Sequence, residues 1–118
     1  MSDSLTEIMA KIEKFAEDRD WHQFHTPRNL VLSILAELGE LAEVFQWRTD
    51  TEINNGIELE KIRGKYEEEI ADVAIYLLRL CQVLDVDLLE VMDKKIHVNE
   101  AKYPISESRG NARKYSDR

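Results

Sequence analysis

The sequence predicts an all-α fold, and three observations support this. The 118-residue chain contains only four Gly and two Pro, which leaves little room for the turns of a β sandwich. Leu, Glu, Ala, Lys and Ile dominate instead, as they do in helical bundles. Apolar residues also recur at helical spacing along most of the chain. With 43% hydrophobic residues, a chain of this length is expected to form one domain with its own core.

The first helix is predicted over about residues 5 to 18. Ser4 and Glu7 have the spacing of a capping box, in which the serine hydroxyl accepts from an amide of the first turn and the glutamate reaches back. One apolar stripe follows at helical spacing, made of Leu5, Ile8, Ile12 and Phe15.

The second helix is predicted from Pro27 to about Trp47. Thr26 is a suitable N-cap, and a proline in the first turn gives up an amide that would have no partner there. A four-helix monomer of this size could not bury every apolar side of this helix, so the sequence predicts a homo-oligomer centred on the second and third helices. These apolar residues are Leu30, Val31, Leu32, Ile34, Leu35, Leu38, Leu41 and Val44.

A polar segment, residues 48 to 57, predicts a loop between these central helices, because it contains the turn-forming residues Asn54, Asn55 and Gly56. The third helix is predicted over about residues 58 to 84, with one continuous apolar face. So short a connection makes the second and third helices antiparallel neighbours.

The fourth helix is predicted over about residues 87 to 102. Asp87 and Glu90 repeat the capping-box spacing at its start, and a proline ends it. Residues 1 to 104 are therefore expected to be one all-α domain. Residues 105 to 118 show no apolar period and are expected to be a C-terminal tail that is either flexible or ordered by a ligand.

Two acid pairs lie in these apolar helices: Glu37 with Glu40 on the second, and Glu69 with Asp72 on the third. Residues three apart share one side of a helix, so antiparallel neighbours can bring all four carboxylates together. Four carboxylates within a few ångströms would repel one another and take up protons unless cations were present. Oxygen ligands of this kind suit Mg²⁺, or else Mn²⁺, better than Zn²⁺.

The alternative is that these acids are an ordinary solvated face. A single acid pair at this spacing usually is one, and Glu43, Glu67 and Glu68 are assigned to that class. Two pairs on consecutive apolar helices are rarer. Spacing alone leaves both interpretations open.

Composition excludes several other classes. A net charge of −8 disfavours a broad grip on nucleic acid, which normally needs a basic face. The chain has no uninterrupted apolar stretch of the ~18 residues that a membrane span needs, and its amphipathic N-terminus does not resemble a signal peptide. The single cysteine, Cys81, lies in an apolar run and is expected to be a core residue in a reducing compartment. We therefore expect a cytoplasmic protein without a nucleic-acid or membrane partner.

Several motifs around the acids resemble a known family. The segments "ELGELAEVFQW" and "EEIADVAIYLL" resemble the E-x-x-E and E-x-x-D halves of the MazG-like all-α nucleoside triphosphate pyrophosphohydrolases. Within that superfamily, "RDWHQFHTPRNL", "FQWRTD", "KYP" and "RKY" are similar to the dCTP pyrophosphatase branch. The likeness covers roughly residues 8 to 115.

The resemblance implies a four-helix MazG-like bundle that hydrolyses a nucleoside triphosphate to a monophosphate and pyrophosphate in nucleotide-pool house-cleaning. It favours dCTP or a modified dCTP as the substrate and a homotetramer built as a dimer of dimers. At Ile12 the animal dCTP enzymes carry a histidine that faces the base, so the preferred base stays open. The implied Mg²⁺ ligands and catalytic residues are Glu37, Glu40, Glu69 and Asp72.

The resemblance also assigns residues to the substrate. Trp21 and Trp47 would frame the base, although either could be an ordinary core residue, and Tyr76 would lie beside the sugar. The remaining residues would meet the phosphates: Lys95, Asn99 and Tyr103 and, in the tail, Arg113 and Lys114.

Spacing agrees with some of these roles. Tyr76 lies one helical turn after Asp72, on the same side of the helix, and Lys95 and Asn99 share a face of the fourth helix. Ordinary surface positions would produce the same spacing. Of the histidines, we expect His22 and His25 to be structural or to support the site from behind, and His97 to be exposed.

Three other functions compete with this one. A ferritin-like di-iron protein would pair Glu with His, whereas both pairs here are purely carboxylate. A non-enzymatic helical interaction protein would use the apolar excess for a partner and would hydrolyse no nucleotide. A dUTP or other nucleoside triphosphate pyrophosphatase of the same superfamily would share the chemistry.

Overall fold

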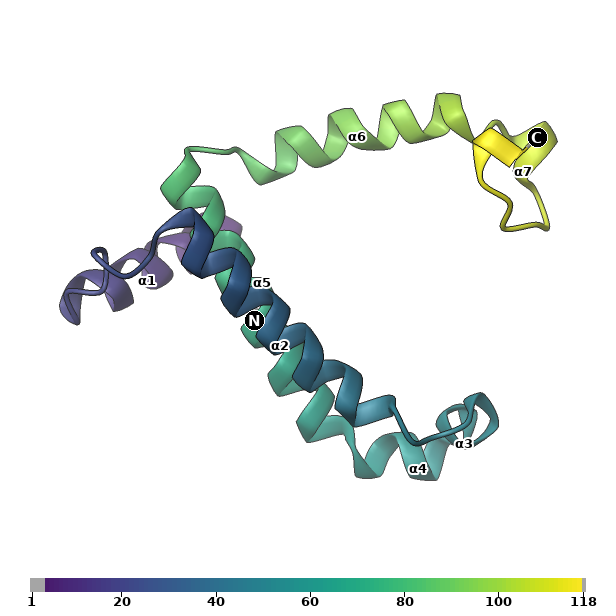
Figure 1. Cartoon of the computed structure of the whole chain (residues 1–118), viewed down its shortest axis with the longest axis horizontal. Helices are drawn as coiled ribbons and strands as arrows, with labels where there is room; N and C mark the ends of the chain where they lie inside the picture. Colours follow the sequence, from purple (N-terminus) through teal and green to yellow (C-terminus); the bar gives the residue numbers. More distant parts are fainter. Residues whose placement is uncertain (1–3, 118) are drawn as a thin grey trace. The chain divides into compact units, whose positions relative to one another are not determined.

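The computed structural model describes residues 4–117, and every regular element in that range is helical (Figure 1). The predicted all-α class is therefore confirmed. The first three residues of the predicted domain and the last residue of the predicted tail lie outside the described range. Within that range, no helix has both the length and the apolar character needed to cross a membrane.

The chain divides into two compact units, Met1–Asp85 and Val86–Arg118. In the first unit, α2 and α5 form the main helix pair and lie side by side, with α1 packed on α5 (Figure 1). Phe45 at the end of α2 stacks on Tyr66 near the start of α5, with ring centroids 6.0 Å apart, so the pair runs antiparallel as predicted. The helices of this unit are α1 (Leu5–Asp18), α2 (Pro27–Phe45), α3 (Asp50–Asn54), α4 (Gly56–Lys61) and α5 (Arg63–Leu84).

The three predicted N-caps are present. The side chains of Ser4, Thr26 and Asp87 each accept a hydrogen bond from the amide three residues further on, at 3.2, 3.2 and 3.1 Å respectively. Each satisfies one of the amides that a helix start leaves without an intrahelical partner. The predicted starts of α1, α2 and α6 are confirmed to within one residue.

The single helix predicted over residues 58 to 84 is wrong, because α4 and α5 are separate helices. They meet at Ile62, whose backbone leaves the helical region with φ −102° and ψ 4°. This side chain is buried, with 5% of its surface exposed. Gly64, the second residue of α5, also has a low helix propensity.

The loop predicted over residues 48 to 57 is also partly helical. Thr49 caps the short helix α3 by accepting from the amide of Glu52 at 3.1 Å. Asn55 then caps α4, since its Oδ1 accepts from the amide of Ile57 at 2.9 Å. The turn-forming residues of this segment therefore act as caps for two short helices.

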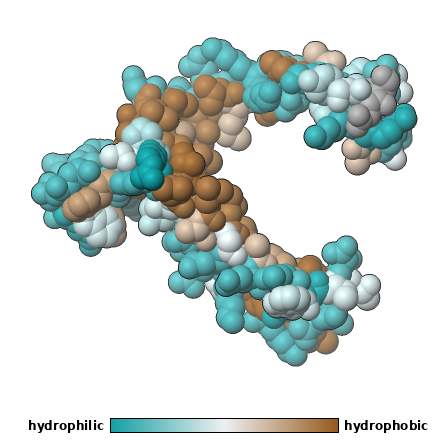
Figure 2. Space-filling model, in the orientation of Figure 1, coloured by the Kyte–Doolittle hydropathy of each residue, from teal (hydrophilic) through white to brown (hydrophobic). Residues whose placement is uncertain are grey.

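The core of the first unit is small. The buried apolar residues among those described are Ala16, Leu30, Val44, Ile62 and Cys81. Cys81 is therefore the core residue that the sequence predicts. Many apolar side chains of α2 remain at the surface, and Figure 2 shows apolar residues gathered over the α2 and α5 pair. Those of α2 that are clearly exposed are Val31, Leu32, Leu35 and Leu38.

The second unit contains α6 (Leu88–Lys102), α7 (Ile105–Ser108) and the 3₁₀ helix η1 (Tyr115–Asp117). The Tyr115 ring packs edge-on against Tyr103 with centroids 5.9 Å apart, and Lys102 Nζ lies 5.0 Å from its centre. Part of the predicted tail is thus helical and folds back on the end of α6. The division of domain and tail at residue 104 stays a prediction.

Candidate active site

Three of the four predicted metal ligands converge on the α2 and α5 pair. Glu37, Glu40 and Glu69 each offer one carboxylate oxygen, and these oxygens all lie within 4.8 Å of one another. Glu37 and Glu69 are half-buried, while Glu40 is exposed. The spacing of three residues and the antiparallel pairing together account for this convergence.

Asp72 lies next to this acid triad and is not one of its three members. Its negative charge acts on Glu37, and both residues line the same cavity. Its predicted part in holding the cation stays a prediction.

The electrostatics of the triad show the strain that a cation would relieve. Burial, followed by the contacts with Glu37 and Glu40, raises the pKa of Glu69 to about 7. Burial likewise raises the pKa of Glu37, with added contributions from Glu40 and from the charge of Asp72. Removing solvent and gathering like charges both favour the protonated form.

The residues present fit a hard divalent cation. Among the described residues, the buried side-chain oxygens without a hydrogen-bond partner are Glu37 Oε2 and Glu69 Oε2. Buried polar atoms of native proteins are normally satisfied, by an ion where no other partner exists. The triad offers only carboxylate oxygens, which suit Mg²⁺ or Mn²⁺.

An apolar cavity of about 640 Å³ adjoins the triad. Four predicted site residues line it, namely Glu37, Asp72, Trp21 and Tyr76, so Trp21 and Tyr76 are brought beside the acids. Trp47 is not among its lining residues and is 84% exposed beyond the end of α2. Most of the remaining wall is apolar and comes from α1 and α5, including Ile8, Ile12, Phe15, Ala74 and Ile75.

A second, polar cavity of about 520 Å³ lies further along the same helix pair. Glu40 and Glu69 line it together with two cationic residues, Arg48 and Lys65. Arg48 Nη1 donates to the carbonyl of Val44, which ties this guanidinium to the end of α2. The triad thus contributes Glu37 to the apolar cavity and its other two members to the polar one.

The predicted phosphate-binding residues all belong to the second unit. Lys95 and Asn99 are exposed on α6, one helical turn apart. Tyr103 packs against the Tyr115 ring, and the Arg113 amide donates to Asn111 Oδ1 at 3.1 Å. Lys114 is exposed between α7 and η1. The roles of these residues, and of Trp47, toward a substrate stay predictions.

Arg79 lines the apolar cavity and was not singled out by the sequence patterns. It lies in the apolar run "YLLRLCQVL". An arginine in such a run is the signal that could have identified it, because a buried charge needs hydrogen-bond partners. Those partners include His22 and His25, and whether the two histidines are purely structural or support the site from behind stays a prediction. His97 is exposed on α6, as predicted.

A family model for MazG-like proteins matches residues 32–117, which include the acid triad and Asp72. The chain belongs to the MazG-like family. The resemblance inferred from the motifs is thereby confirmed.

Similar proteins extend this MazG-like assignment over nearly the whole chain. Mouse (Mus musculus) dCTP pyrophosphatase 1 is 45% identical over 114 residues, covering 97% of this chain and 67% of that protein. The human (Homo sapiens) dCTP pyrophosphatase 1 is 41% identical over 114 residues with the same coverage, 97% and 67%. The crystal structure of a pyrophosphatase from Archaeoglobus fulgidus is 42% identical and superposes with a TM-score of 0.80, covering 88% of this chain and 95% of that one.

Proposed function

We propose that this MazG-like chain hydrolyses a nucleoside triphosphate to a monophosphate and pyrophosphate, with dCTP or a modified dCTP as the favoured substrate. The observation that carries the proposal is the convergence of three carboxylate oxygens within 4.8 Å beside a cavity of about 640 Å³. The relatives named dCTP pyrophosphatase 1 support the enzyme class and the favoured base. Hydrolysis of dUTP or another nucleoside triphosphate is the alternative.

Glu37, Glu40 and Glu69 would hold Mg²⁺, with Mn²⁺ as a substitute and Asp72 as the fourth ligand. A bound divalent cation would supply positive charge opposite the triphosphate and activate water for attack. The acids would hold the cation, and a carboxylate of the cluster would accept the proton of the attacking water. Pyrophosphate is then the leaving group.

Base and sugar would occupy the apolar cavity. Trp21 offers a flat apolar wall on which a base can stack, and Tyr76 lies near the acids, in the position proposed for the sugar. Trp47 would add a second platform. The phosphate contacts proposed from the second unit are Lys95, Asn99, Tyr103, Arg113 and Lys114.

We also propose that the working form is a homo-oligomer, a dimer of dimers, that cleans the nucleotide pool in the cytoplasm. The exposed apolar residues of α2 support an assembly, and so do those of α6. On α6 they include Leu89, Met92 and Ile96, which are 61%, 49% and 53% exposed.

The experiment is to incubate the protein with each canonical dNTP and several modified dCTPs in the presence of Mg²⁺ and to resolve the products. Monophosphate with pyrophosphate is expected, fastest for dCTP or a modified dCTP. A preference for dUTP would select the alternative substrate. Diphosphate with orthophosphate would contradict the assigned bond, and no hydrolysis of any nucleotide would favour a non-enzymatic helical interaction protein.

A further inference from the structure

Arg79 is a charged residue buried in the first unit, with only 3% of its surface exposed. It projects from α5 one helical turn after Tyr76 and lines the apolar cavity. A guanidinium in such a place costs free energy unless its donors are matched by acceptors. The hydrogen-bond partners of Arg79 therefore indicate its role.

The Arg79 guanidinium contacts α1, the connection between α1 and α2, and its own helix α5. Nε donates to His25 Nδ1 at 2.9 Å and Nη2 to His22 Nδ1 at 2.9 Å, both in the connection between α1 and α2. Nη1 donates to Glu13 of α1 and, at 3.0 Å, to Gln82 of its own helix. One side chain thus fastens α1 and the connection to α5.

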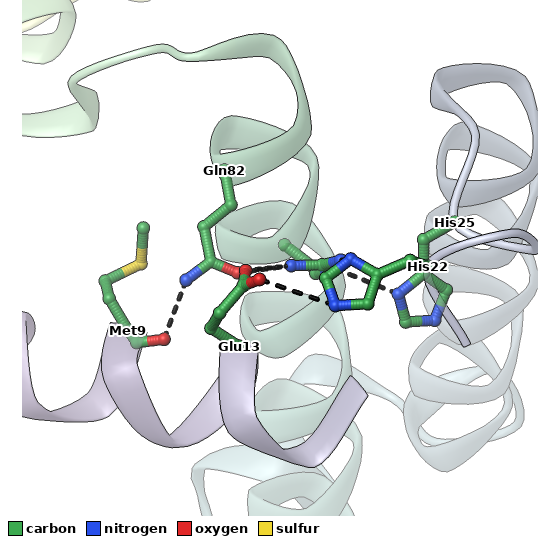
Figure 3. A network of polar contacts seen from close by, with 6 residues as sticks. Met9, Glu13, His22, His25 and Gln82 are labelled. Carbon is green, nitrogen blue, oxygen red and sulfur yellow. Dashed lines mark hydrogen bonds and ion pairs between the residues drawn. The ribbon is translucent and has the colours of Figure 1, made fainter. Parts of the chain in front are cut away.

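Gln82 strengthens the same junction from a second direction (Figure 3). Its amide nitrogen donates to the carbonyl of Met9 at 2.7 Å, which binds α1 to α5 a turn away from Glu13. The α1 side is therefore held at two points. The connection after α1 is joined to α5 through the two histidines.

Residues 21 to 25, in the connection between α1 and α2, form part of the wall of the apolar cavity. Trp21 and His25 both line that cavity, and their rings lie edge to face with centroids 6.1 Å apart. Trp21 also packs edge-on against Phe15 of α1, with centroids 5.6 Å apart. The position of the indole thus follows from the position of His25, and Arg79 fixes His25.

We propose that Arg79 is a positioning residue that holds residues 21 to 25 against α5 and so keeps Trp21 in place as the wall that meets the nucleotide base. This inference rests on the proposed function. Arg79 is not assigned to the chemistry, because it acts on the substrate through His25 and Trp21.

The geometry fixes which ring nitrogen of each histidine accepts from Arg79. A guanidinium has donors only, so each Nδ1 facing Arg79 must accept. The charged groups facing the histidines are Arg79 of α5 and Glu13 of α1, and His22 Nε2 lies 3.5 Å from the Glu13 carboxylate. A second proton on His25 would break its contact with Arg79 and release the connection.

The first test compares Arg79→Gln with Arg63→Gln. Arg63 is a matched control, because it lies on the same helix but is exposed and pairs with Glu67 outside both cavities. Arg79→Gln is expected to raise KM about tenfold while kcat changes less than about threefold, since the loss concerns orientation of the base. Arg79→Lys should fail to restore KM, because an ammonium cannot replace the planar fork. A fall in kcat alone, or the same kinetics in both glutamine variants, would overturn the proposal.

The second test does not depend on hydrolysis. The chain has two tryptophans, so Trp47→Phe leaves Trp21 as the only indole reporter. Adding Arg79→Gln is expected to increase acrylamide quenching of Trp21 at least about twofold, since the wall loosens. Unchanged quenching in a variant that keeps its helical circular dichroism would overturn the proposal.

Should Arg79→Gln not fold, His22→Ala provides the test, because it removes one acceptor of Arg79 in the connection and keeps the His25 ring that packs on Trp21. His97→Ala, at an exposed position on α6, is its control. Greater Trp21 quenching in His22→Ala alone supports the proposal, and equal quenching in both contradicts it. If the wild-type chain hydrolysed no nucleotide while quenching still rose, the proposed function would fail and the positioning of Trp21 by Arg79 would stand.

Discussion

At the scale of single residues, the three carboxylates of the acid triad repel one another when no cation is bound. Burial and the neighbouring Glu37 and Glu40 together raise the pKa of Glu69 from 4.5 to about 7. The folded chain therefore binds this proton more tightly than the unfolded chain does. The stability that the protonated Glu69 contributes is fully present below pH 4.5 and is lost as the pH rises through about 7.

The first prediction follows for protein kept in a chelator. Its urea midpoint is expected to fall as the pH rises from 4.5 to about 7, and Glu69→Gln should remove most of this dependence. Mg²⁺ should restore the midpoint at pH 8, because a cation then replaces the proton. Glu43→Gln is the control, since Glu43 is an exposed acid on α2 outside the triad. A midpoint that does not respond to Mg²⁺ would count against a metal site.

The second prediction concerns turnover. Glu40→Gln and Asp72→Asn should each lower kcat more than about 100-fold while the circular dichroism stays helical, because cation binding is lost and packing is not. Glu43→Gln is again the control and should retain activity. Asp72→Asn tests the ligand assignment more strictly than Glu40→Gln, because Asp72 lies outside the triad. Full activity in Asp72→Asn would remove it from the ligand set.

The third prediction separates the two tryptophans. Trp47 is 84% exposed, so Trp47→Ala should leave the free energy of unfolding nearly unchanged. Losing a stacking platform worth ~1–3 kcal/mol should still weaken nucleotide binding about 5-fold or more. Equilibrium titration with a non-hydrolysable dCTP analogue measures this loss of binding. Unchanged binding together with a lower kcat would show that Trp47 does not meet the base.

At the scale of helices, prediction from sequence succeeded where the signal is local. Ser4, Thr26 and Asp87 mark helix starts because a cap acts on an amide only three residues away. The meeting of Glu37 with Glu69 was also predictable, because it needs only helical spacing and antiparallel pairing. The break at Ile62 was not, since it depends on which side chain the folded unit buries.

Arg79 shows the same limit more clearly. Its bonds to His25 and Glu13 span 54 and 66 residues of sequence, so no local pattern announces them. The sequence indicates only that an arginine stands in an apolar run. Packing decides which acceptors it meets.

The fourth prediction belongs to α2. Thr26→Ala should lower the free energy of unfolding by about 1 kcal/mol, because an amide at the start of this helix loses its partner. Thr49→Ala is the matched control, since Thr49 makes the equivalent contact at a five-residue helix. Chemical denaturation should show a smaller loss for it. Equal losses would mean that the two caps support the fold to the same extent.

At the scale of the whole molecule, the motifs identified the MazG-like family and the enzyme class, a nucleoside triphosphate pyrophosphatase, and the relatives confirm both. The family motifs indicate the acidic residues and the fold, which are common to MazG-like proteins. Ile12 lines the cavity proposed to hold the base, and no general pattern specifies which base such a residue would favour.

The fifth prediction concerns assembly. Light scattering at micromolar concentration should give a mass close to four times the 13.8 kDa of one chain. Leu35→Glu, which charges an apolar position that is 59% exposed, should yield smaller species. Glu43→Gln should leave the mass unchanged. A wild-type mass of one chain would contradict the predicted oligomer.

The burial of Cys81 provides a built-in reporter of unfolding. The chain has one cysteine, its surface is 6% exposed, and burial raises the pKa of its thiol. A buried, protonated thiol is a poor nucleophile, so a disulfide reagent should modify it only when α5 opens. The rate of thiol labelling then measures the opening of this helix in the natural sequence, one signal per chain, with and without nucleotide.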